Sequence, residues 1–268
     1  MTAVEALLLG ILEGLTEFLP VSSTGHLVLL GRGLGHEDAA AKSLSIVIQL
    51  GAVVAVIVYY RALLGDLLRG LLRRDPAKIR LAVALGVAFV PAAAVGFLLG
   101  GRIKEHLLKP LPVAVAAILG GIVMIMSEVI LRGRKAHEDE GIYGVRLRQA
   151  LAVGVAQCFA LWPGMSRSMT TILGGQLVGL KTATAAEFSF LLSIPVLGAA
   201  TLYDLVKSRD VLLSSSDAAV SLGVGLLSAF VVSLAVIAVF LRYLKRIGLI
   251  PFGVYRLILG VVVIAVAR

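Results

Sequence analysis

The 268-residue sequence contains one cysteine and few charged residues. A single thiol, that of Cys158, excludes an internal disulfide framework and a metal cluster built on cysteines, and its simplest interpretation is a small buried apolar residue. Charged residues make up only 15% of the chain, 59% of it is hydrophobic, and the mean hydropathy is +1.00. This composition excludes a soluble globular domain.

Two further absences narrow the class of protein. Alternating strands of about ten residues, typical of outer-membrane barrels, do not occur, and the first segment lacks a basic leader and a small-residue cleavage site. We therefore expect that segment to belong to the mature protein. The formal net charge of +9 does not indicate nucleic acid, because the basic residues cluster in short loops between apolar segments.

Apolar runs of about 20 residues, each long enough to cross a bilayer, predict an all-α polytopic membrane protein. They occupy 4–30, 43–60, 81–101, 111–131, 149–180, 184–204, 218–241 and 249–267. The first and the fifth are interrupted by Pro20 and Pro163, each followed by Ser, Gly and Thr. Proline breaks a helix, and broken backbone is tolerated at membrane depth only where protein or water satisfies it. We expect both segments to be re-entrant helical hairpins.

The interrupted segments also match each other. A gapless shift of 144 residues aligns Gly10 with Gly154, Glu13 with Gln157, Ser22 with Ser166 and Gly31 with Gly175. Each half would hold one re-entrant hairpin and three transmembrane helices, and three crossings invert the second half. We predict a single integral membrane domain, residues 1–268, with inverted repeats of about 1–131 and 145–268. Interrupted segments at matching positions point to a site near the membrane midplane.

The basic residues also predict an orientation. The loops on one side carry 15 Lys and Arg, and those on the other side carry 8. The richer side is expected to be cytoplasmic, so both termini and the mouth of the first hairpin would face outward. The basic residues of the richer side lie in 61–80, 132–148, Lys181 and 242–246.

Two acids lie inside the first hairpin. A charge at the membrane centre costs roughly 2.5–3.5 kcal/mol, so such groups usually mark function, and Glu13 and Glu17 share one helical face. Ser22 or Ser23 is expected to cap the returning helix, whose N-terminus would bind an anion. His26 is expected to point over the same pocket.

The second hairpin repeats this design and adds Arg167, whose planar fork of donors suits phosphate oxygens. If the two turns meet, helix N-termini, an arginine and several hydroxyls converge beside two acids. Paired acids can hold Mg²⁺ or Ca²⁺ against phosphate. The pattern therefore predicts a phosphate site with a divalent cation.

Structural roles are the alternatives. Glu13 and Glu17 could pair with Arg167 to pin the hairpins together, Ser22 and Ser23 could act only as caps, and His26 could hydrogen-bond a neighbour. In the other segments, Arg256 is expected to be structural, pairing with Glu187 or Glu128 or reaching the interface, and Gln49 could line the site.

The two hairpins resemble a known family, the undecaprenyl-diphosphate phosphatases of the bacitracin-resistance type. The motif E-G-L-T-E-F-L-P-V-S-S-T-G-H runs unbroken from Glu13 to His26, and P-G-x-S-R-S-x-x-T runs from Pro163 to Thr171. The similarity spans the chain, including F-S-F-L-L-x-I-P at 188–195 and V-I-Q-L-G at 47–51. Met169-Thr170 replaces the usual Gly-Ala, which bears on the tightness of the turn and not on the chemistry.

The resemblance implies an integral inner-membrane hydrolase, often dimeric. Its substrate would be the lipid undecaprenyl diphosphate, and its product would be the monophosphate carrier lipid of peptidoglycan synthesis. Loss of the diphosphate, which is the target of bacitracin, would explain the resistance. A polyprenyl-phosphate transporter or flippase with the same inverted repeats is the alternative function, and a membrane scaffold is a third.

On this basis we assign expected roles. Ser23 is the first choice as nucleophile, with His26 or Glu17 accepting its proton, and the rival has His26 as nucleophile or as base for water. The expected catalytic residues are Glu17, Ser23, His26 and Arg167. The expected phosphate-binding residues are Ser22, Thr24, Ser166, Ser168 and Thr171. The expected ligands of Mg²⁺ or Ca²⁺ are Glu13 and Glu17.

Overall fold

The computed structural model describes residues 2–35, 39–131 and 141–267. Within these ranges the chain consists of helices, turns and caps, and the all-α polytopic prediction is confirmed. Residues 132–140 of the predicted 132–148 connector lie outside the described residues. The elements are α1 (Ala3–Thr16), α2 (Ser23–Gly33), α3 (Ala39–Tyr59), α4 (Arg61–Leu72), α5 (Pro76–Leu107), α6 (Pro110–Leu131), η1 (Ile142–Gly144), α7 (Leu147–Cys158), η2 (Phe159–Leu161), α8 (Arg167–Leu177), α9 (Thr182–Leu212), α10 (Ser216–Ile247) and α11 (Ile250–Ala267).

Four helices in the described part of the chain, α5, α6, α9 and α10, are long and apolar enough to cross a membrane. Helices α3 and α4 count as a fifth span if they are taken together, although they are bent by 71° at their junction. Helix α11 is also apolar, and its 18 residues extend about 27 Å, just short of the hydrocarbon core. Each of the six predicted spans therefore falls on a helix, and the protein is multi-pass.

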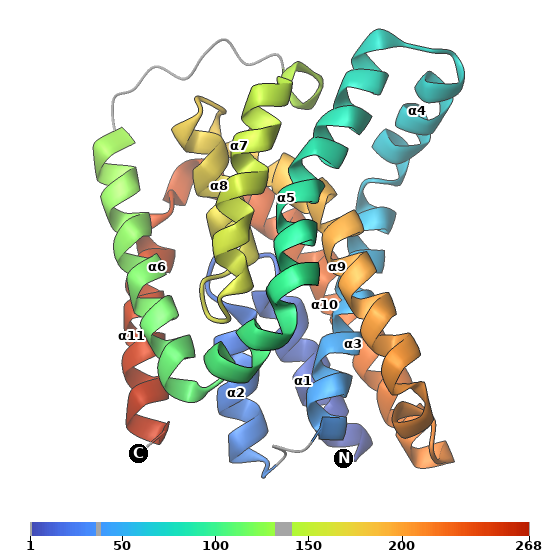
Figure 1. The fold of residues 1–268 in the computed structure, drawn as a ribbon, viewed down its shortest axis with the longest axis vertical. Coiled ribbons are helices and arrows are strands. Elements are labelled where there is room, and N and C mark those ends of the chain that lie inside the picture. The colour runs from blue at the N-terminus through green and yellow to red at the C-terminus, as the bar shows by residue number, and fades with distance from the viewer. Residues whose placement is uncertain (1, 36–38, 132–140, 268) are drawn as a thin grey trace.

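Two helix pairs form hairpins whose turns lie inside the bundle. In Figure 1, α1 and α2 occupy the lower half, and α7 and α8 occupy the upper half. Their turns, 17–22 and 162–166, lie near mid-height, and we call them tip 1 and tip 2. The hairpins thus open toward opposite ends of the molecule, as an inverted repeat requires. The inverted relation of the remaining helices stays a prediction.

The segment 61–80, expected to be a loop, is helical over most of its length. Helix α4 is amphipathic, with Leu67 buried and Arg61 and Arg69 exposed, so its arginines lie on a helix surface instead of a loop. A new helix begins because Asp75 accepts hydrogen bonds from the N–H groups of Ala77 and Lys78 and because proline suits the first helical position. The basic residues correctly indicated that 61–80 lies at an end of the bundle, but the expectation that this segment is a loop was wrong.

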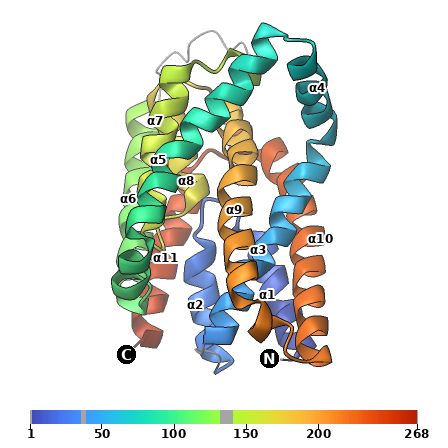
Figure 2. The same cartoon turned by 45° about the vertical axis from the view of Figure 1, so that its right-hand side comes forward.

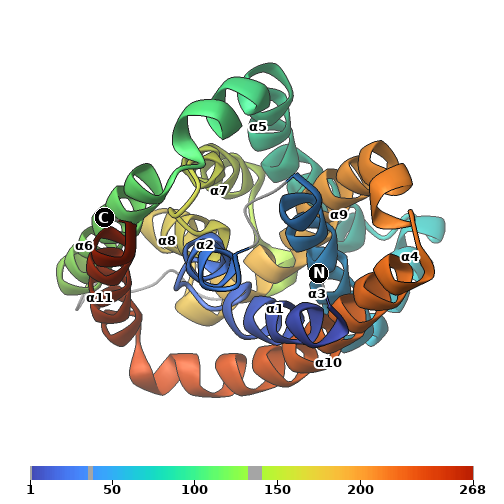
Figure 3. The same ribbon diagram turned by 90° about the horizontal axis from the view of Figure 1, so that it is seen from below.

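Close helix packing positions the first hairpin. Helix α1 lies along α10, α6 lies along α11, and α2 stands between these pairs when the bundle is viewed from below (Figure 3). Gly10 and Gly14 permit the first contact, because a Cβ at Gly10 would overlap Ser228 Oγ and one at Gly14 would lie 2.9 Å from the Ala229 carbonyl oxygen. Figure 2 shows α9 beside α3, on the far side of α1 and α2 from α6 and α11.

Candidate active site

The two hairpin tips share an uncommon backbone conformation. Ser22 and Ser166 have φ angles of 74° and 72°, in a region that residues other than glycine seldom adopt. Each caps the helix that follows: Ser22 Oγ accepts from the Gly25 N–H at 3.2 Å, and Ser166 Oγ accepts from the Met169 N–H at 3.3 Å. Of the two caps proposed for α2, Ser22 is therefore correct, and it is the residue that aligns with Ser166.

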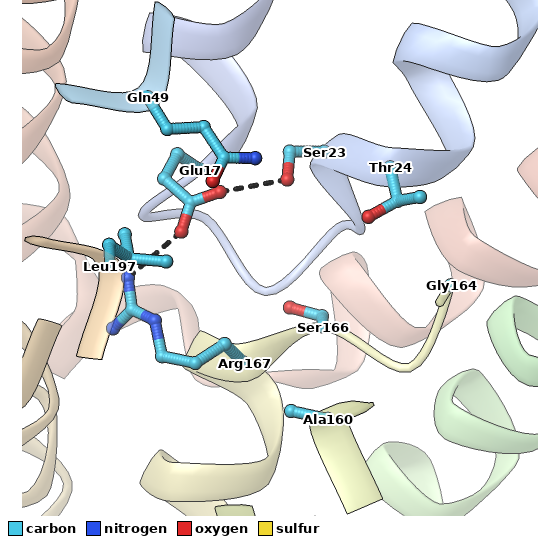
Figure 4. A pocket seen from close by; sticks show the side chains of 9 residues that line it. All are labelled: Glu17, Ser23, Thr24, Gln49, Ala160, Gly164, Ser166, Arg167 and Leu197. Atoms are coloured by element: carbon cyan, nitrogen blue, oxygen red, sulfur yellow. Dashed lines mark hydrogen bonds and ion pairs between the residues drawn. The ribbon is translucent and has the colours of Figure 1, made fainter. Parts of the chain in front are cut away.

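A cavity of about 180 Å³ lies between the tips (Figure 4). It receives side chains from the α1–α2 hairpin, α3, the α7–α8 hairpin and α9. Its lining residues are Glu17, Ser23, Thr24, Gln49, Ala160, Gly164, Ser166, Arg167 and Leu197. Three of the four expected catalytic residues thus share one cavity, and Gln49 joins them as anticipated.

Glu17 links the two hairpins through both of its carboxylate oxygens. Ser23 Oγ donates to Glu17 Oε2 at 2.8 Å, and Arg167 Nη2 donates to Glu17 Oε1 at 3.2 Å. The side chains of Arg167 and Glu17 are only 9% and 6% exposed. An ion pair so far from water is weakly screened, and it leaves the carboxylate directed at the Ser23 hydroxyl.

The guanidinium of Arg167 is held from behind by α9. Its Nη1 donates to the carbonyl oxygen and to Oγ of Ser189, at 2.9 and 3.1 Å, and Thr171 Oγ1 lies 2.6 Å from Ser189 Oγ. The guanidinium also stands over the Phe18 ring, 5.6 Å from its centre. Ser189 received no role from the sequence, although it lies in the F-S-F stretch that contributed to the family resemblance.

Two helix N-termini converge on this cavity. Helix α2 begins at Ser23 and α8 begins at Arg167, and both residues line it. The unsatisfied N–H groups and the positive ends of the two helix dipoles make such a place an anion site. The electrostatics therefore favour a negatively charged group between the tips.

Of the five expected phosphate-binding residues, Thr24 and Ser166 line the cavity and three do not. Ser22 is buried as a cap. Ser168 Oγ donates to the Leu19 carbonyl oxygen at 3.0 Å, which ties tip 2 to tip 1, and Thr171 Oγ1 donates to the Arg167 carbonyl oxygen at 2.8 Å. These three hydroxyls thus support the wall of the site from behind.

His26 does not point over the cavity as expected. Its Nδ1 lies 2.7 Å from the Ser22 carbonyl oxygen, and its Nε2 lies 2.6 Å from Tyr255 Oη on α11. The two rings stack with their planes 9° apart. Both ring nitrogens are therefore engaged, Nδ1 with the backbone of tip 1 and Nε2 with α11, and His26 is not among the residues that line the cavity.

The arrangement around Glu13 bears on the expected cation. Glu13 is completely buried, and its carboxyl oxygens have no hydrogen-bond partner among the described residues. It lies one helical turn before Glu17, whose oxygens already contact Ser23 and Arg167. No cluster of three or more His, Cys, Asp or Glu occurs in the described ranges. Glu13 does not line the cavity, but two carboxyl oxygens without partners are the kind of ligand that a hard cation takes together with oxygens of water and phosphate.

Arg256 is completely buried, and its described hydrogen bonds go to backbone carbonyls instead of to the expected partners Glu187 or Glu128. Complete burial also excludes the alternative that its side chain reaches the interface. The acceptors belong to the two tips and to α6, so the residue adjoins the site without lining the cavity.

The fold and the site define an integral membrane protein with a buried anion site that places a serine hydroxyl against a carboxylate. The profile of the family described as bacitracin resistance protein BacA matches residues 6–262, and the chain belongs to this family. A protein of Sorangium cellulosum named undecaprenyl-diphosphatase is 61% identical over 260 residues, covering 97% of this chain and 85% of the relative. Proteins with the same name from Cupriavidus necator and Clostridium tetani are 43% and 41% identical, over 99% and 98% of this chain and 95% and 96% of theirs.

Proposed function

We propose that this protein is a hydrolase that converts undecaprenyl diphosphate into undecaprenyl phosphate and inorganic phosphate. The observation that carries the proposal is the Ser23–Glu17–Arg167 chain between two helix N-termini. Its relatives are named undecaprenyl-diphosphatase, and its family is named for bacitracin resistance. The reaction recycles the carrier lipid of cell-wall synthesis and removes the diphosphate that bacitracin targets.

In the proposed mechanism Ser23 is the nucleophile. Its Oγ attacks the terminal phosphorus, its proton passes to Glu17, and the bond from that phosphorus to the bridging oxygen breaks. Undecaprenyl phosphate leaves, and water then cleaves the bond between phosphorus and Ser23 Oγ to release phosphate. The 2.8 Å contact between Ser23 and Glu17 favours Glu17 over His26 as the proton acceptor. The rival, with His26 as nucleophile or base, would require its ring to leave Tyr255.

Polar groups around the cavity would hold the phosphate oxygens. Arg167, the N–H groups that begin α2 and α8, and the hydroxyls of Thr24 and Ser166 all line this space. Phosphoryl transfer depends mainly on such positioning and charge neutralisation. Donors fixed by the tips need little reorganisation when charge develops.

A divalent cation, Mg²⁺ or Ca²⁺, would complete the proposed site. Glu13 and Glu17 would hold it, because Glu13 offers two carboxyl oxygens without partners next to Glu17. When bound, such an ion would neutralise part of the diphosphate charge. The side chains themselves would still provide the nucleophile and the proton acceptor.

The proposed location is the bacterial inner membrane, with the basic end of the bundle in the cytoplasm. The segment 61–80 lies at the end opposite both chain termini (Figure 1), which agrees with the charge partition of the sequence. The mouth of the α1–α2 hairpin would then open to the outer side. The isoprenoid chain would lie among membrane lipids, and we propose a homodimer as the assembly.

Phosphate release by the purified protein tests the function. We expect it to release phosphate from undecaprenyl diphosphate, and Ser23→Ala to lower the rate by at least about 10²-fold. Ser214→Ala, at an exposed position between α9 and α10, is the matched control. Tight binding of the lipid without phosphate release would instead favour the transporter.

A further inference from the structure

We propose that Arg256 is a positioning residue that clamps the two hairpin tips in register, so that Ser23 and Glu17 on one hairpin meet Arg167 on the other. The proposal rests on the proposed function, because the consequence of losing this register is a loss of hydrolysis. Arg256 itself does not line the cavity, so it would act through the tips.

The hydrogen bonds of Arg256 reach three separate elements. Nη1 donates to the carbonyl oxygen of Pro20 in tip 1 at 3.5 Å. Nη2 donates to the carbonyl oxygens of Gly164 in tip 2 at 3.0 Å and of Ala116 in α6 at 3.2 Å. One guanidinium on α11 therefore binds both tips and the neighbouring helix α6.

The two tip carbonyls are equivalent positions of the repeat. The 144-residue shift that aligns the hairpins places Pro20 on Gly164, and it also places Ser23 on Arg167. The carbonyl group bound by Arg256 precedes the first residue of the following helix, Ser23 or Arg167, by three positions in each tip. Arg256 thus donates hydrogen bonds to equivalent carbonyl groups of the two turns, each two residues before the serine cap with positive φ.

The surroundings are shaped to admit a guanidinium. A Cβ at Gly120 would overlap Arg256 Nη2 and lie 2.9 Å from Cζ, and one at Gly121 would lie 3.2 Å from Arg256 Cβ. Gly164 has a φ angle of 101°, and a Cβ there would lie 3.0 Å from the Val113 carbonyl carbon. Tip 2 is therefore pressed onto α6 at the place where the arginine crosses between them.

The chemistry explains why the residue is an arginine. Carbonyls in a turn have no helical partner, and leaving one buried without a hydrogen bond is costly. A planar fork with five N–H donors can satisfy several of them at fixed angles, whereas lysine offers one nitrogen. Because a misplacement of about 1 Å can lower a rate by about 10²-fold, a clamp on both tips has a direct effect on catalysis.

Two substitutions disturb the clamp by different routes. Arg256→Lys keeps the charge but loses the fork, and Gly120→Ala keeps the arginine but fills the space that its Nη2 occupies. We expect each to lower kcat at least about 10-fold while KM changes less than about 3-fold, because substrate contacts remain and alignment is lost. Arg102→Lys, an exposed arginine, and Gly86→Ala, where a Cβ meets nothing within 4 Å, are the matched controls.

A double-mutant cycle separates positioning from general destabilisation. If Arg256 acts through the alignment of Arg167, the loss caused by Arg167→Lys should shrink at least about 10-fold in the Arg256→Lys background. Additive losses, a rise in KM with unchanged kcat, or full activity of Arg256→Lys would each overturn the proposal.

An observation independent of catalysis completes the test. Trp162, the only tryptophan of the chain, lies in tip 2, where its Nε1 donates to the Pro112 carbonyl oxygen at 3.1 Å. We expect Arg256→Lys and Gly120→Ala to shift its emission and increase its quenching by acrylamide, and the controls to match the wild type. Unchanged tryptophan signals in both variants would refute the clamp even if hydrolysis itself were absent. An inactive wild type, combined with changed tryptophan signals in the two variants, would refute only the proposed function.

Discussion

At the scale of single residues, the site depends on a division of labour between equivalent positions. Ser23 begins α2 and Arg167 begins α8, and the repeat places one on the other. One tip therefore presents a nucleophile candidate, and the other presents a cation at the corresponding point. Glu17 joins them and has Leu161 as its counterpart, so the acid belongs to the first hairpin alone.

Ser189 should matter for catalysis although it lies outside the cavity lining. Ser189→Ala removes an acceptor from Arg167 and a partner from Thr171. A hydrogen bond to a charged group is worth about 1.5–3 kcal/mol, so we expect kcat/KM to fall about 10-fold to 100-fold. Steady-state phosphate release measures this. Ser193→Ala is the control, because that buried hydroxyl on α9 bonds within its own helix, and an equal loss there would contradict the assigned role.

The strained cap at Ser22 predicts an unusual order of stability. Ser22→Ala loses the cap, at about 0.5–2 kcal/mol, and keeps a side chain at positive φ, whereas glycine costs only a few tenths as a cap and tolerates that φ. Thermal unfolding in detergent should therefore rank Ser22→Gly above Ser22→Ala. A glycine variant less stable than the alanine variant would show that this backbone conformation is not the one adopted.

The motifs predicted the chemical identity of the site better than its orientation. They brought Glu17, Ser23 and Arg167 together correctly, because ionisable residues inside membrane segments are costly and usually face one another across a polar site. They could not show which hydroxyls face the cavity, because a turn with positive φ breaks the helical periodicity on which such an inference depends. The direction of His26 depends on Tyr255, 229 residues away, and no local pattern encodes that contact.

At the scale of elements, the first hairpin owes its position to the small residues of α1. Gly10 and Gly14 allow α1 to lie directly against the backbone of α10, as small residues spaced by four do in other membrane helices. The prolines predicted both hairpins, whereas α4 was missed because its arginines suggested a loop. Amphipathic helices at a membrane end carry the same charges as loops, so charge alone cannot separate the two.

This packing predicts a localised effect of added volume. Gly10→Ala introduces a Cβ that would overlap Ser228 Oγ, so the helices must separate, and overpacking typically costs about 1–3 kcal/mol. We expect a lower unfolding temperature in detergent together with reduced activity, because Glu17 directly follows α1. Gly100→Ala, with open space around it, should change neither, and a neutral Gly10→Ala would contradict the close approach.

At the scale of the whole molecule, the hairpins open toward opposite ends and their tips meet inside the bundle (Figure 1). In the proposed reaction the charged head group would lie in the polar cavity while its chain stays in an apolar environment. The charge count of the sequence and the placement of 61–80 opposite the termini agree on which end is basic.

Thiol labelling tests the proposed orientation. In a Cys158→Ser background, Ser214→Cys and Arg73→Cys each give one exposed thiol, the first in the turn between α9 and α10 and the second in the turn between α4 and α5. These two turns lie at opposite ends of the bundle (Figure 1). A membrane-impermeant reagent added to intact cells with a permeabilised outer membrane should label the thiol at position 214 and spare the one at 73. Lysed cells should show both labelled. The reverse pattern in intact cells would mean that the basic end faces outward.

In the proposed reaction Ser23, assisted by Glu17, takes the phosphoryl group. Rapid acid quenching of the enzyme with undecaprenyl diphosphate radiolabelled in its terminal phosphate tests this directly. We predict covalently bound label in the wild type and in His26→Ala, and none in Ser23→Ala that remains folded. Label on Ser23→Ala at the wild-type level would show that Ser23 is not the nucleophile.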